Sequence, residues 1–380
     1  MNTTCEWKEY ELGKLLTYEQ PTSYIVESTE YNDKYKTPVL TAGKSFILGY
    51  TNETQGIYKA PPVIIFDDFT TASQYVNFEF KVKSSAMKIL TPNTELVLPK
   101  FIYYRMQIIQ FDHSTHKRYW IQQYSKIKVS VPPIPVQEQI VAKIEELFSE
   151  LDKGVETLQK TKQQLAVYRQ AVLKQAFSAD DNAVKVASIC TVVRGGSPRP
   201  AGDEKYYNGT IPFLKVADLT NNADMYLYSH TYTIKEAGLT KTRLVPANTL
   251  LLSNSGATLG VPKICTFETT FNDGIAAFLG LDYNKEYLPY HYYFWLSKLP
   301  EMRAIDQGAA QPNLNTTIIG DVDIPHHDIQ TQKQIAEWIE SRLSVCDNIE
   351  KTVDITLQQA EAMRQSILKQ AFEGSNKRGL

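Results

Sequence analysis

Two stretches of this sequence decide the fold, because they repeat each other. Residues 139–177 read QIVAKIEELFSELDKGVETLQKTKQQLAVYRQAVLKQAF, and residues 334–372 read QIAEWIESRLSVCDNIEKTVDITLQQAEAMRQSILKQAF. Aligned without a gap, about 17 of the 39 positions are identical, and both copies end in Leu-Lys-Gln-Ala-Phe. The period of roughly 190 residues is far longer than that of a solenoid repeat. The chain is therefore organised as two halves, each a variable block followed by a repeated block.

The repeated blocks are predicted to form long helices. Apolar residues recur every seven positions through each block, which contains no proline, and 39 residues at about 1.5 Å each span roughly 58 Å. A lone helix with such a stripe would be marginal, so we expect the two to pack as an antiparallel pair with approximate two-fold symmetry. The alternative is that each lies against its own domain. The expected packing residues are Ile144, Leu151, Leu158, Leu165 and Val172 in the first helix, and Ile339, Cys346, Val353, Ala360 and Ile367 in the second.

The variable blocks are predicted to be compact α+β domains. Strand-like segments at 62–66, 86–90, 249–252 and 276–281 are rich in β-formers, and helices are expected at 99–109 and 289–299. The predicted fold class is α+β: two globular domains of mixed sheet plus helices, joined by two long antiparallel coiled-coil-like helices in a pseudo-two-fold repeat. The expected boundaries are 1–133 for the first domain, 134–180 for the first helix, 181–325 for the second domain and 326–380 for the second helix.

Composition narrows the class of protein. With 380 residues, 43% hydrophobic and 22% charged, the chain has material for two or three domains and is neither disordered nor a disulfide scaffold. No apolar run approaches the roughly 18 residues that a membrane span needs, so we expect a cytoplasmic protein without membrane contact. The formal net charge of -2 argues against nucleic-acid binding by bulk positive charge. The four cysteines, expected to be buried or incidental thiols, are Cys5, Cys190, Cys265 and Cys346.

Motifs for catalysis are missing. The sequence has no phosphate-binding loop, dinucleotide fingerprint, HExxH or GxSxG pattern, and no [DNS]-P-P-[YF] loop of enzymes that methylate base amino groups. His113 and His116 have metal-ligand spacing but no supporting cysteines or carboxylates. His326 and His327 are expected to be solvent-exposed. We therefore expect a non-catalytic chain with no metal and no cofactor of its own.

Several short motifs recur in a recognisable order. They are residues 134–140 and 324–336 at the helix starts, the two Leu-Lys-Gln-Ala-Phe endings, 194–198, 211–215 and 311–314 in the second block, and 38–43 and 64–70 in the first. The order of these motifs, together with the duplication, resembles the DNA-specificity subunits of Type I restriction–modification systems. The resemblance extends over nearly the whole chain, although the first block has no clear counterpart of residues 311–314.

Membership of this family would imply a partner-dependent reader of double-stranded DNA. Each variable block would be a target-recognition domain for one half of a bipartite, asymmetric target, and the helices would act as spacer and scaffold. Two modification subunits, with or without restriction subunits, would dock on the chain and supply S-adenosylmethionine-dependent adenine methylation and ATP- and Mg²⁺-dependent cleavage. These partners would also supply much of the phosphate contact that the near-neutral chain lacks.

Candidate DNA contacts are polar residues beside glycines and turns, because Arg, Lys, Asn and Gln can read base edges and glycine allows close backbone approach. For each of them a solvated turn residue is the alternative. In the first domain they are Lys44, Ser73, Gln74, Lys81, Lys83 and Lys88; in the second they are Arg194, Ser197, Arg199, Lys215, Ser253, Asn254, Ser255, Gln311 and Asn313.

Two other classes of protein remain open at this stage. A structural adaptor could use the helix pair to join two protein partners without reading DNA, but it would not explain why the two domains diverge. A self-contained enzyme would need an unrecognised site in one variable block.

Overall fold

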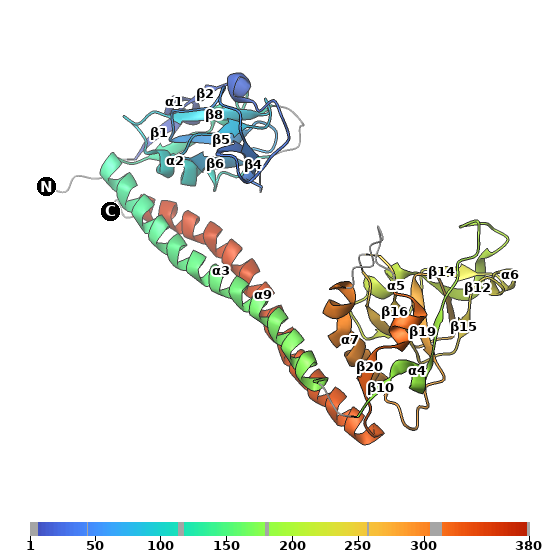
Figure 1. The fold of residues 1–380 in the computed structure, drawn as a ribbon. Helices are drawn as coiled ribbons and strands as arrows, with labels where there is room; N and C mark the ends of the chain where they lie inside the picture. The colour runs from blue at the N-terminus through green and yellow to red at the C-terminus, as the bar shows by residue number, and fades with distance from the viewer. Residues whose placement is uncertain are drawn as a thin grey trace. The chain divides into compact units, whose positions relative to one another are not determined.

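The computed structural model divides into two compact units (Figure 1). Unit 1 comprises Met1–Gln159 and Asp354–Leu380, and unit 2 comprises Lys160–Val353. Each unit thus combines one domain with parts of both long helices. The residues described are 7–43, 45–112, 118–178, 182–256, 258–304 and 314–377.

The domain of unit 1 is built on one antiparallel sheet and one mixed sheet. A four-stranded antiparallel sheet has the order β2-β8-β5-β6, a three-stranded sheet has the order β4-β3-β7 with β3 and β7 parallel, and β1 pairs with β9. The central strand β5 has four consecutive buried residues, so both of its faces are covered. The strands are β1 Lys8–Glu11, β2 Leu16–Glu19, β3 Thr37–Leu40, β4 Ile47–Thr51, β5 Val63–Asp67, β6 Ser73–Val76, β7 Lys81–Val82, β8 Met87–Pro92 and β9 Lys128–Val131, and the helices are α1 Leu12–Leu15 and α2 Pro99–Met106, with 3-10 turns at Pro21–Tyr24 and Tyr124–Lys126.

The domain of unit 2 has a five-stranded sheet and a four-stranded sheet. Their orders are β11-β19-β16-β17-β13 and β14-β12-β18-β15, and β10 pairs with β20. The strands are β10 Ala183–Lys185, β11 Thr191–Arg194, β12 Tyr207–Leu214, β13 Tyr226–Leu227, β14 Tyr232–Ile234, β15 Leu244–Val245, β16 Thr249–Ser253, β17 Pro262–Cys265, β18 Thr269–Phe271, β19 Ile275–Leu279 and β20 Asp323–Pro325, and the helices are α4 Val186–Ile189, α5 Val216–Thr220, α6 Glu236–Leu239, α7 Leu288–Ala304 and α8 Thr316–Gly320.

The two long helices are α3, Ile134–Ala176, and α9, Ile329–Lys377. They run side by side (Figure 1), and ion pairs show that they are antiparallel. In unit 1, Arg364 of α9 pairs with Asp152 of α3; in unit 2, Arg169 of α3 pairs with Asp347 of α9 at 2.7 Å. Low numbers on one helix meet high numbers on the other, which is the predicted pairing.

The predicted packing positions lie on the covered side of both helices. In α3 the two positions in the middle of the helix are only half-buried, whereas in α9 the middle positions are buried and only Ile367, toward the C-terminal end, is half-buried. Buried positions are Ile144, Leu165, Val172, Ile339, Cys346, Val353 and Ala360; half-buried positions are Leu151, Leu158 and Ile367.

The repeated Leu-Lys-Gln-Ala-Phe endings pack against a domain helix in each unit. The Phe372 ring lies edge-on to Phe101 of α2, with ring centres 5.3 Å apart. In unit 2 the Phe177 ring contacts Tyr290 and Phe294 of α7, at 5.2 Å and 5.5 Å. Both endings are therefore part of a domain core, which gives a structural reason for their close similarity.

Most of the predicted elements are confirmed. The strands expected at 62–66, 86–90, 249–252 and 276–281 correspond to β5, β8, β16 and β19, and the expected domain helices correspond to α2 and α7. Cys190, Cys265 and Cys346 are buried free thiols, as predicted, whereas Cys5 lies outside the described residues. Among the helices described, none combines the length and apolarity that crossing a bilayer requires.

Candidate nucleic-acid interface and helix junctions

A tight turn between β5 and β6 presents Phe69 at the surface of unit 1. The Asp67 carboxylate accepts hydrogen bonds from the backbone N–H groups of Phe69 and Thr70, at 2.8 Å and 2.9 Å. Thr71 has a φ of 56°, the left-handed conformation that closes the turn. The Phe69 side chain is 43% exposed. The turn therefore has a fixed backbone and an exposed aromatic side chain.

Lys88 lies beneath this turn, which corrects its assignment as a DNA contact. Its ammonium is 3.2 Å from the Asp68 carboxylate, and both side chains are 1% exposed. The other Asp68 carboxylate oxygen accepts the Trp120 backbone N–H at 2.8 Å. A lysine held in a buried ion pair cannot reach a ligand in this conformation.

The other candidates of unit 1 divide between internal and surface positions. The Lys81 ammonium is buried, pairs with Glu53 at 2.7 Å and donates to the Gln55 carbonyl, so it too is internal. Ser73 is 7% exposed, and its hydroxyl accepts a hydrogen bond from Gln107 at 2.8 Å. Gln74 is half-buried and Lys83 is exposed, so these two remain available; Lys44 lies outside the described residues.

In unit 2, the loop that follows β11 is held against the chain between β18 and β19. Arg194 Nε donates to the Asp273 carbonyl at 2.5 Å, and the Ser197 hydroxyl donates to the Asp273 carboxylate at 2.7 Å. Gly195 allows this close approach, because a Cβ there would collide with the Asn272 carbonyl, and Gly196 allows an equally close approach to the Lys241 carbonyl. Arg194 and Arg199 are both exposed at the loop surface, as a DNA-contact role requires.

The remaining candidates of unit 2 do not form one uniform surface. The Lys215 ammonium lies 3.5 Å from the Tyr232 ring centre, where the ring stabilises its charge. Ser253 is buried, and its hydroxyl closes the following loop by donating to the Thr258 carbonyl and accepting from the Val261 N–H. Asn254 is buried, and its side-chain amide has no hydrogen-bond partner among the described residues; Ser255 is half-buried. Gln311 and Asn313 lie outside the described residues.

The sequence interpretation missed three residues at these surfaces: Phe69, Arg243 and Asp273. Arg243 Nε donates to the Arg194 carbonyl at 3.0 Å, which adds a third guanidinium beside the loop. Asp273 organises that loop from a distant part of the chain. Only Phe69 had a local signal, since it lies next to the Asp-Asp pair that begins the turn.

At each domain–helix junction, a buried glutamine near the start of the long helix ties that helix to its domain. In unit 1, Gln137 donates to the carbonyls of Leu96 and Pro132, at 3.0 Å and 2.8 Å, and accepts the Leu98 N–H at 2.8 Å. All three bonds are made to backbone groups, and Gln137 is fully buried. This side chain therefore fixes where α3 leaves the domain.

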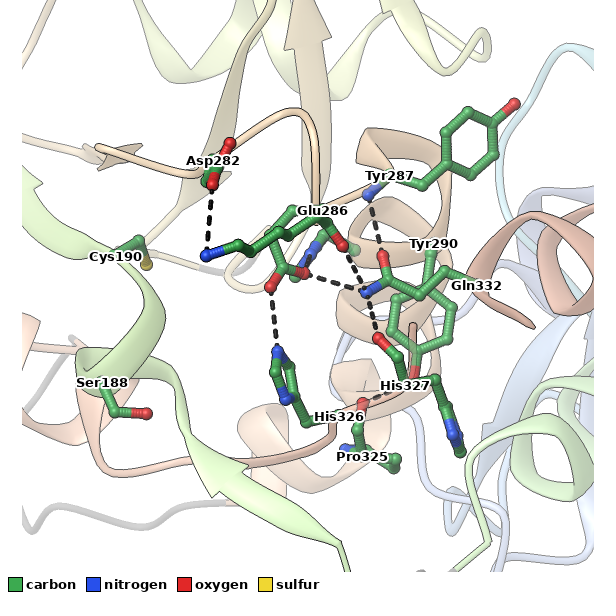
Figure 2. Close-up of polar contacts among 12 residues, drawn as sticks. Ser188, Cys190, Asp282, Glu286, Tyr287, Tyr290, Pro325, His326, His327 and Gln332 are labelled. Atoms are coloured by element: carbon green, nitrogen blue, oxygen red, sulfur yellow. Dashed lines mark hydrogen bonds and ion pairs between the residues drawn. The ribbon is translucent and has the colours of Figure 1, made fainter. Parts of the chain in front are cut away.

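Gln332 makes the corresponding bonds in unit 2 and joins them to an ionisable cluster (Figure 2). It accepts the Tyr287 N–H at 2.8 Å and donates to the Lys285 and His327 carbonyls and to Glu286, at 3.1 Å, 2.9 Å and 3.1 Å respectively. The Glu286 carboxylate, 5% exposed, also contacts His291 at 2.8 Å and His326 at 3.1 Å.

The electrostatics of this cluster favour a charged Glu286. Burial alone would raise the pKa of its carboxyl, but hydrogen bonds and charge from His291, with further bonds from Gln332 and His326, lower that pKa. Burial of the Cys190 thiol, together with the nearby charge of Glu286, raises the pKa of that thiol to about 12. His326 was expected to be a solvated residue; it is exposed, but one ring nitrogen is committed to Glu286.

No group of three or more potential metal ligands occurs within the part of the chain that the structure describes. In the Glu286 cluster, each histidine nitrogen that faces the carboxylate bonds to it, so these groups satisfy one another. His113 and His116 lie outside the described residues.

A duplicated scaffold that carries two divergent α+β domains defines a class of two-domain recognition proteins. The family model for the Type I restriction modification DNA specificity domain matches this chain twice, over residues 5–165 and 180–359. The chain therefore belongs to that family.

Individual relatives agree with this assignment. The chain is 38% identical over 257 residues to the type I restriction enzyme EcoR124I/EcoR124II specificity subunit of Escherichia coli, which is 63% of this chain and 62% of that protein. A second relative, the type I restriction enzyme MjaIX specificity subunit of Methanocaldococcus jannaschii, is 28% identical over 43% of this chain and 38% of its own length. The matched region thus spans less than two thirds of either relative.

Solved structures show the same fold. A chain from a structure that describes complex assembly and conformational transition of the type I R-M system has a TM-score of 0.71 at 16% identity, over 96% of this chain and 97% of its own. The HsdS subunit from Thermoanaerobacter tengcongensis has a TM-score of 0.54 at 18% identity, over 97% of both chains.

Proposed function

We propose that this chain is the sequence-specific DNA-recognition subunit of a Type I restriction–modification complex. One observation supports this best: the specificity-domain family model matches each half separately, on a scaffold that repeats while the domains diverge. A scaffold without a DNA role would not need two different domains.

Each domain reads one half of a bipartite, asymmetric DNA target. The candidate surfaces differ in chemistry, because unit 1 offers an aromatic turn with Gln74 and Lys83, whereas unit 2 offers the guanidinium groups of Arg194, Arg199 and Arg243. Arginine pairs with the major-groove edge of guanine and glutamine with that of adenine. Two unlike surfaces on one chain lead to an asymmetric target.

The long helices set the distance between the two half-sites. Half-sites read from one face of a duplex lie about one helical turn apart, roughly 34 Å. Helix α3 has 43 residues, which corresponds to about 65 Å at 1.5 Å per residue. The unread spacer of the target then depends on helix length and not on the domains.

Two modification subunits dock on this chain, one for each repeat. Between the two copies, the packing positions Leu151, Leu158 and Leu165 correspond to Cys346, Val353 and Ala360, whereas several exposed polar positions are unchanged. Packing alone would not preserve solvent-exposed side chains, but a partner that binds twice would. The exposed identical pairs include Ser149 and Ser344, Gln163 and Gln358, Gln170 and Gln365, and Lys174 and Lys369.

The chemistry belongs to the partners. The modification subunits bind S-adenosylmethionine and methylate adenine, and restriction subunits, where present, use ATP and Mg²⁺ to cleave DNA. This chain recognises the target sequence. Its net charge of -2 fits a DNA-recognition subunit that relies on its partners for most phosphate contacts. The complex acts in the cytoplasm, where it meets the DNA that it modifies.

The test is methylated-base sequencing of host DNA with and without this gene, and with one heptad inserted into α3 between Glu145 and Gln170. Loss of a bipartite methylated motif on deletion, and a longer spacer with unchanged half-sites on insertion, would support the proposal. Unchanged methylation on deletion would favour the adaptor, and altered half-site bases with an unchanged spacer would refute the role of the helices.

A further inference from the structure

We propose that Phe69 stacks on a DNA base in the half-site bound by unit 1, and that the buried Asp68–Lys88 ion pair positions it for this contact. The inference rests on the proposed function. It adds Phe69 as a residue that contacts DNA, and Asp68 and Lys88 as residues that position Phe69.

Phe69 has the exposure and the rigid backbone that such a contact requires. Its side chain is 43% exposed, while its N–H is fixed by the Asp67 carboxylate at 2.8 Å. The turn is closed by the Asp67 N–H, which donates to the Ala72 carbonyl at 2.8 Å. Proteins that kink DNA insert apolar side chains such as phenylalanine between base steps, and stacking on a base stabilises an aromatic ring that is otherwise in water.

The support beneath the turn is more elaborate than stability requires. Asp68 makes four polar contacts: its N–H donates to the Ala86 carbonyl at 3.0 Å, its carbonyl accepts the Tyr119 N–H at 2.9 Å, and its carboxylate contacts the Trp120 N–H and the Lys88 ammonium. A buried ion pair is often no more stabilising than well-packed apolar residues of the same volume. Its presence directly below Phe69 is explained if it holds one conformation of the turn.

A cation stands beside the exposed ring. The Arg118 guanidinium lies 5.9 Å from the centre of the Phe69 ring and is itself exposed. A guanidinium binds a phosphate with two parallel hydrogen bonds. Phe69 and Arg118 together therefore offer an apolar wedge next to a phosphate-binding group, which suits a nucleic acid better than a protein partner.

The experiment uses the full chain assembled with its modification subunit and a duplex that carries the target read from the host methylome. 2-Aminopurine is placed in each half-site in turn, because its fluorescence rises when a base is unstacked. Phe69→Ala is compared with Ile47→Ala, which removes another side chain of unit 1 that is 40% exposed.

We expect Phe69→Ala to weaken binding by about ten-fold or more and to abolish the fluorescence rise in one half-site only, while Ile47→Ala leaves both unchanged. Asp68→Asn combined with Lys88→Met removes both charges but keeps an oxygen acceptor for the Trp120 N–H. This double variant should reduce the fluorescence rise in the same half-site while its melting temperature shows a folded chain.

Binding within two-fold of wild type and an unchanged fluorescence rise with Phe69→Ala would overturn the inference. So would weakened subunit assembly with a normal fluorescence rise at saturating protein, which would assign Phe69 to the modification subunit. If wild type itself does not distinguish the target from other duplexes, the proposed function fails instead.

Discussion

The two halves of the molecule anchor their long helices through the same backbone bonds but surround these bonds with different side chains. Gln137 and Gln332 each anchor the start of a long helix through equivalent backbone bonds. When the two halves are matched by these bonds, Val97 is equivalent to Glu286 and Ile102 is equivalent to His291. All four residues are buried. One junction is completed by apolar packing and the other by an ion-paired cluster. The backbone links are therefore the shared requirement, and what surrounds them has been free to change.

Part of the exposed surface of the long helices shows the opposite pattern, because several exposed polar positions there are identical in the two halves. This difference leads to the largest predicted effect. Ser149→Arg and Ser344→Arg each place a large cation at an exposed position that is identical in both copies. Each single variant should bind one modification subunit instead of two, and the double variant should bind about a hundred-fold more weakly. Native mass spectrometry of the assembled complex measures both.

The matched controls are Glu150→Arg and Val345→Arg, at neighbouring exposed positions that differ between the copies. If these controls reduce the stoichiometry as much as the serine variants do, the conserved positions have no special part in docking.

The next largest effect is expected from removing the Glu286 carboxylate, which should destabilise unit 2. Glu286→Ala leaves His291 and His326 without the carboxylate that each contacts, and we expect it to cost about 3 kcal/mol. Glu286→Val combined with His291→Ile recreates the apolar junction of the other half and should cost less than the single variant. Hydrogen exchange resolved by peptide reports the opening of unit 2, with unit 1 as the internal reference. A double variant no better than Glu286→Ala would show that the two junctions are not interchangeable.

Acid should separate the two junctions further. The pKa of Glu286 is lowered in the folded chain, so folding favours its charged form. Its contribution is fully present above the unfolded value near 4.5 and is lost as the pH falls through the lower folded value. Around this carboxylate, the titratable neighbours are His291, His326 and Cys190.

We therefore expect unit 2 to lose protection against hydrogen exchange below about pH 4.5, and Glu286→Gln to flatten this pH dependence. Equal acid sensitivity of Glu286→Gln and wild type would assign the effect to other groups.

The smallest effect is expected at the interhelix ion pairs. Arg169→Met removes the pairs to Asp347 and Glu350, at 2.7 Å and 3.0 Å, and Arg364→Met removes the pair to Asp152. The carboxylates are largely in water, so each change should cost about 1 kcal/mol or less. Urea unfolding measures this, and a cost above about 2 kcal/mol would mean that these arginines do more than pair with surface charges.

The architecture could be predicted well from the sequence, because the spacing of apolar residues directly indicates which elements form and which of their faces are buried. The heptad spacing of Ile144 and its successors, and the repeated ending at Phe177 and Phe372, are local patterns that report burial in helices. The strands were also predictable from local sequence, since β5 and β16 are short apolar runs between turn residues.

The candidate site was only partly predictable, because burial of a polar residue depends on distant partners. Lys88 and Lys83 look alike in sequence, but only Lys88 meets Asp68 across the sheet. Likewise, nothing near Arg194 in the sequence indicates that Asp273, almost eighty positions away, shapes its loop. The same applies to Glu286, whose partners come from α7, the segment after β20 and α9.

The packing of Phe372 has a consequence for the order in which the molecule is completed on the ribosome. Unit 2 is a continuous segment, Lys160–Val353, so all of its residues have been synthesised before the chain ends. Unit 1 begins first, but its core includes Leu368 and Phe372. Domains generally fold as they emerge, yet here the first domain to emerge is the last whose core can be closed. A premature stop within the final turns of α9 would therefore damage the beginning of the protein and leave its middle intact.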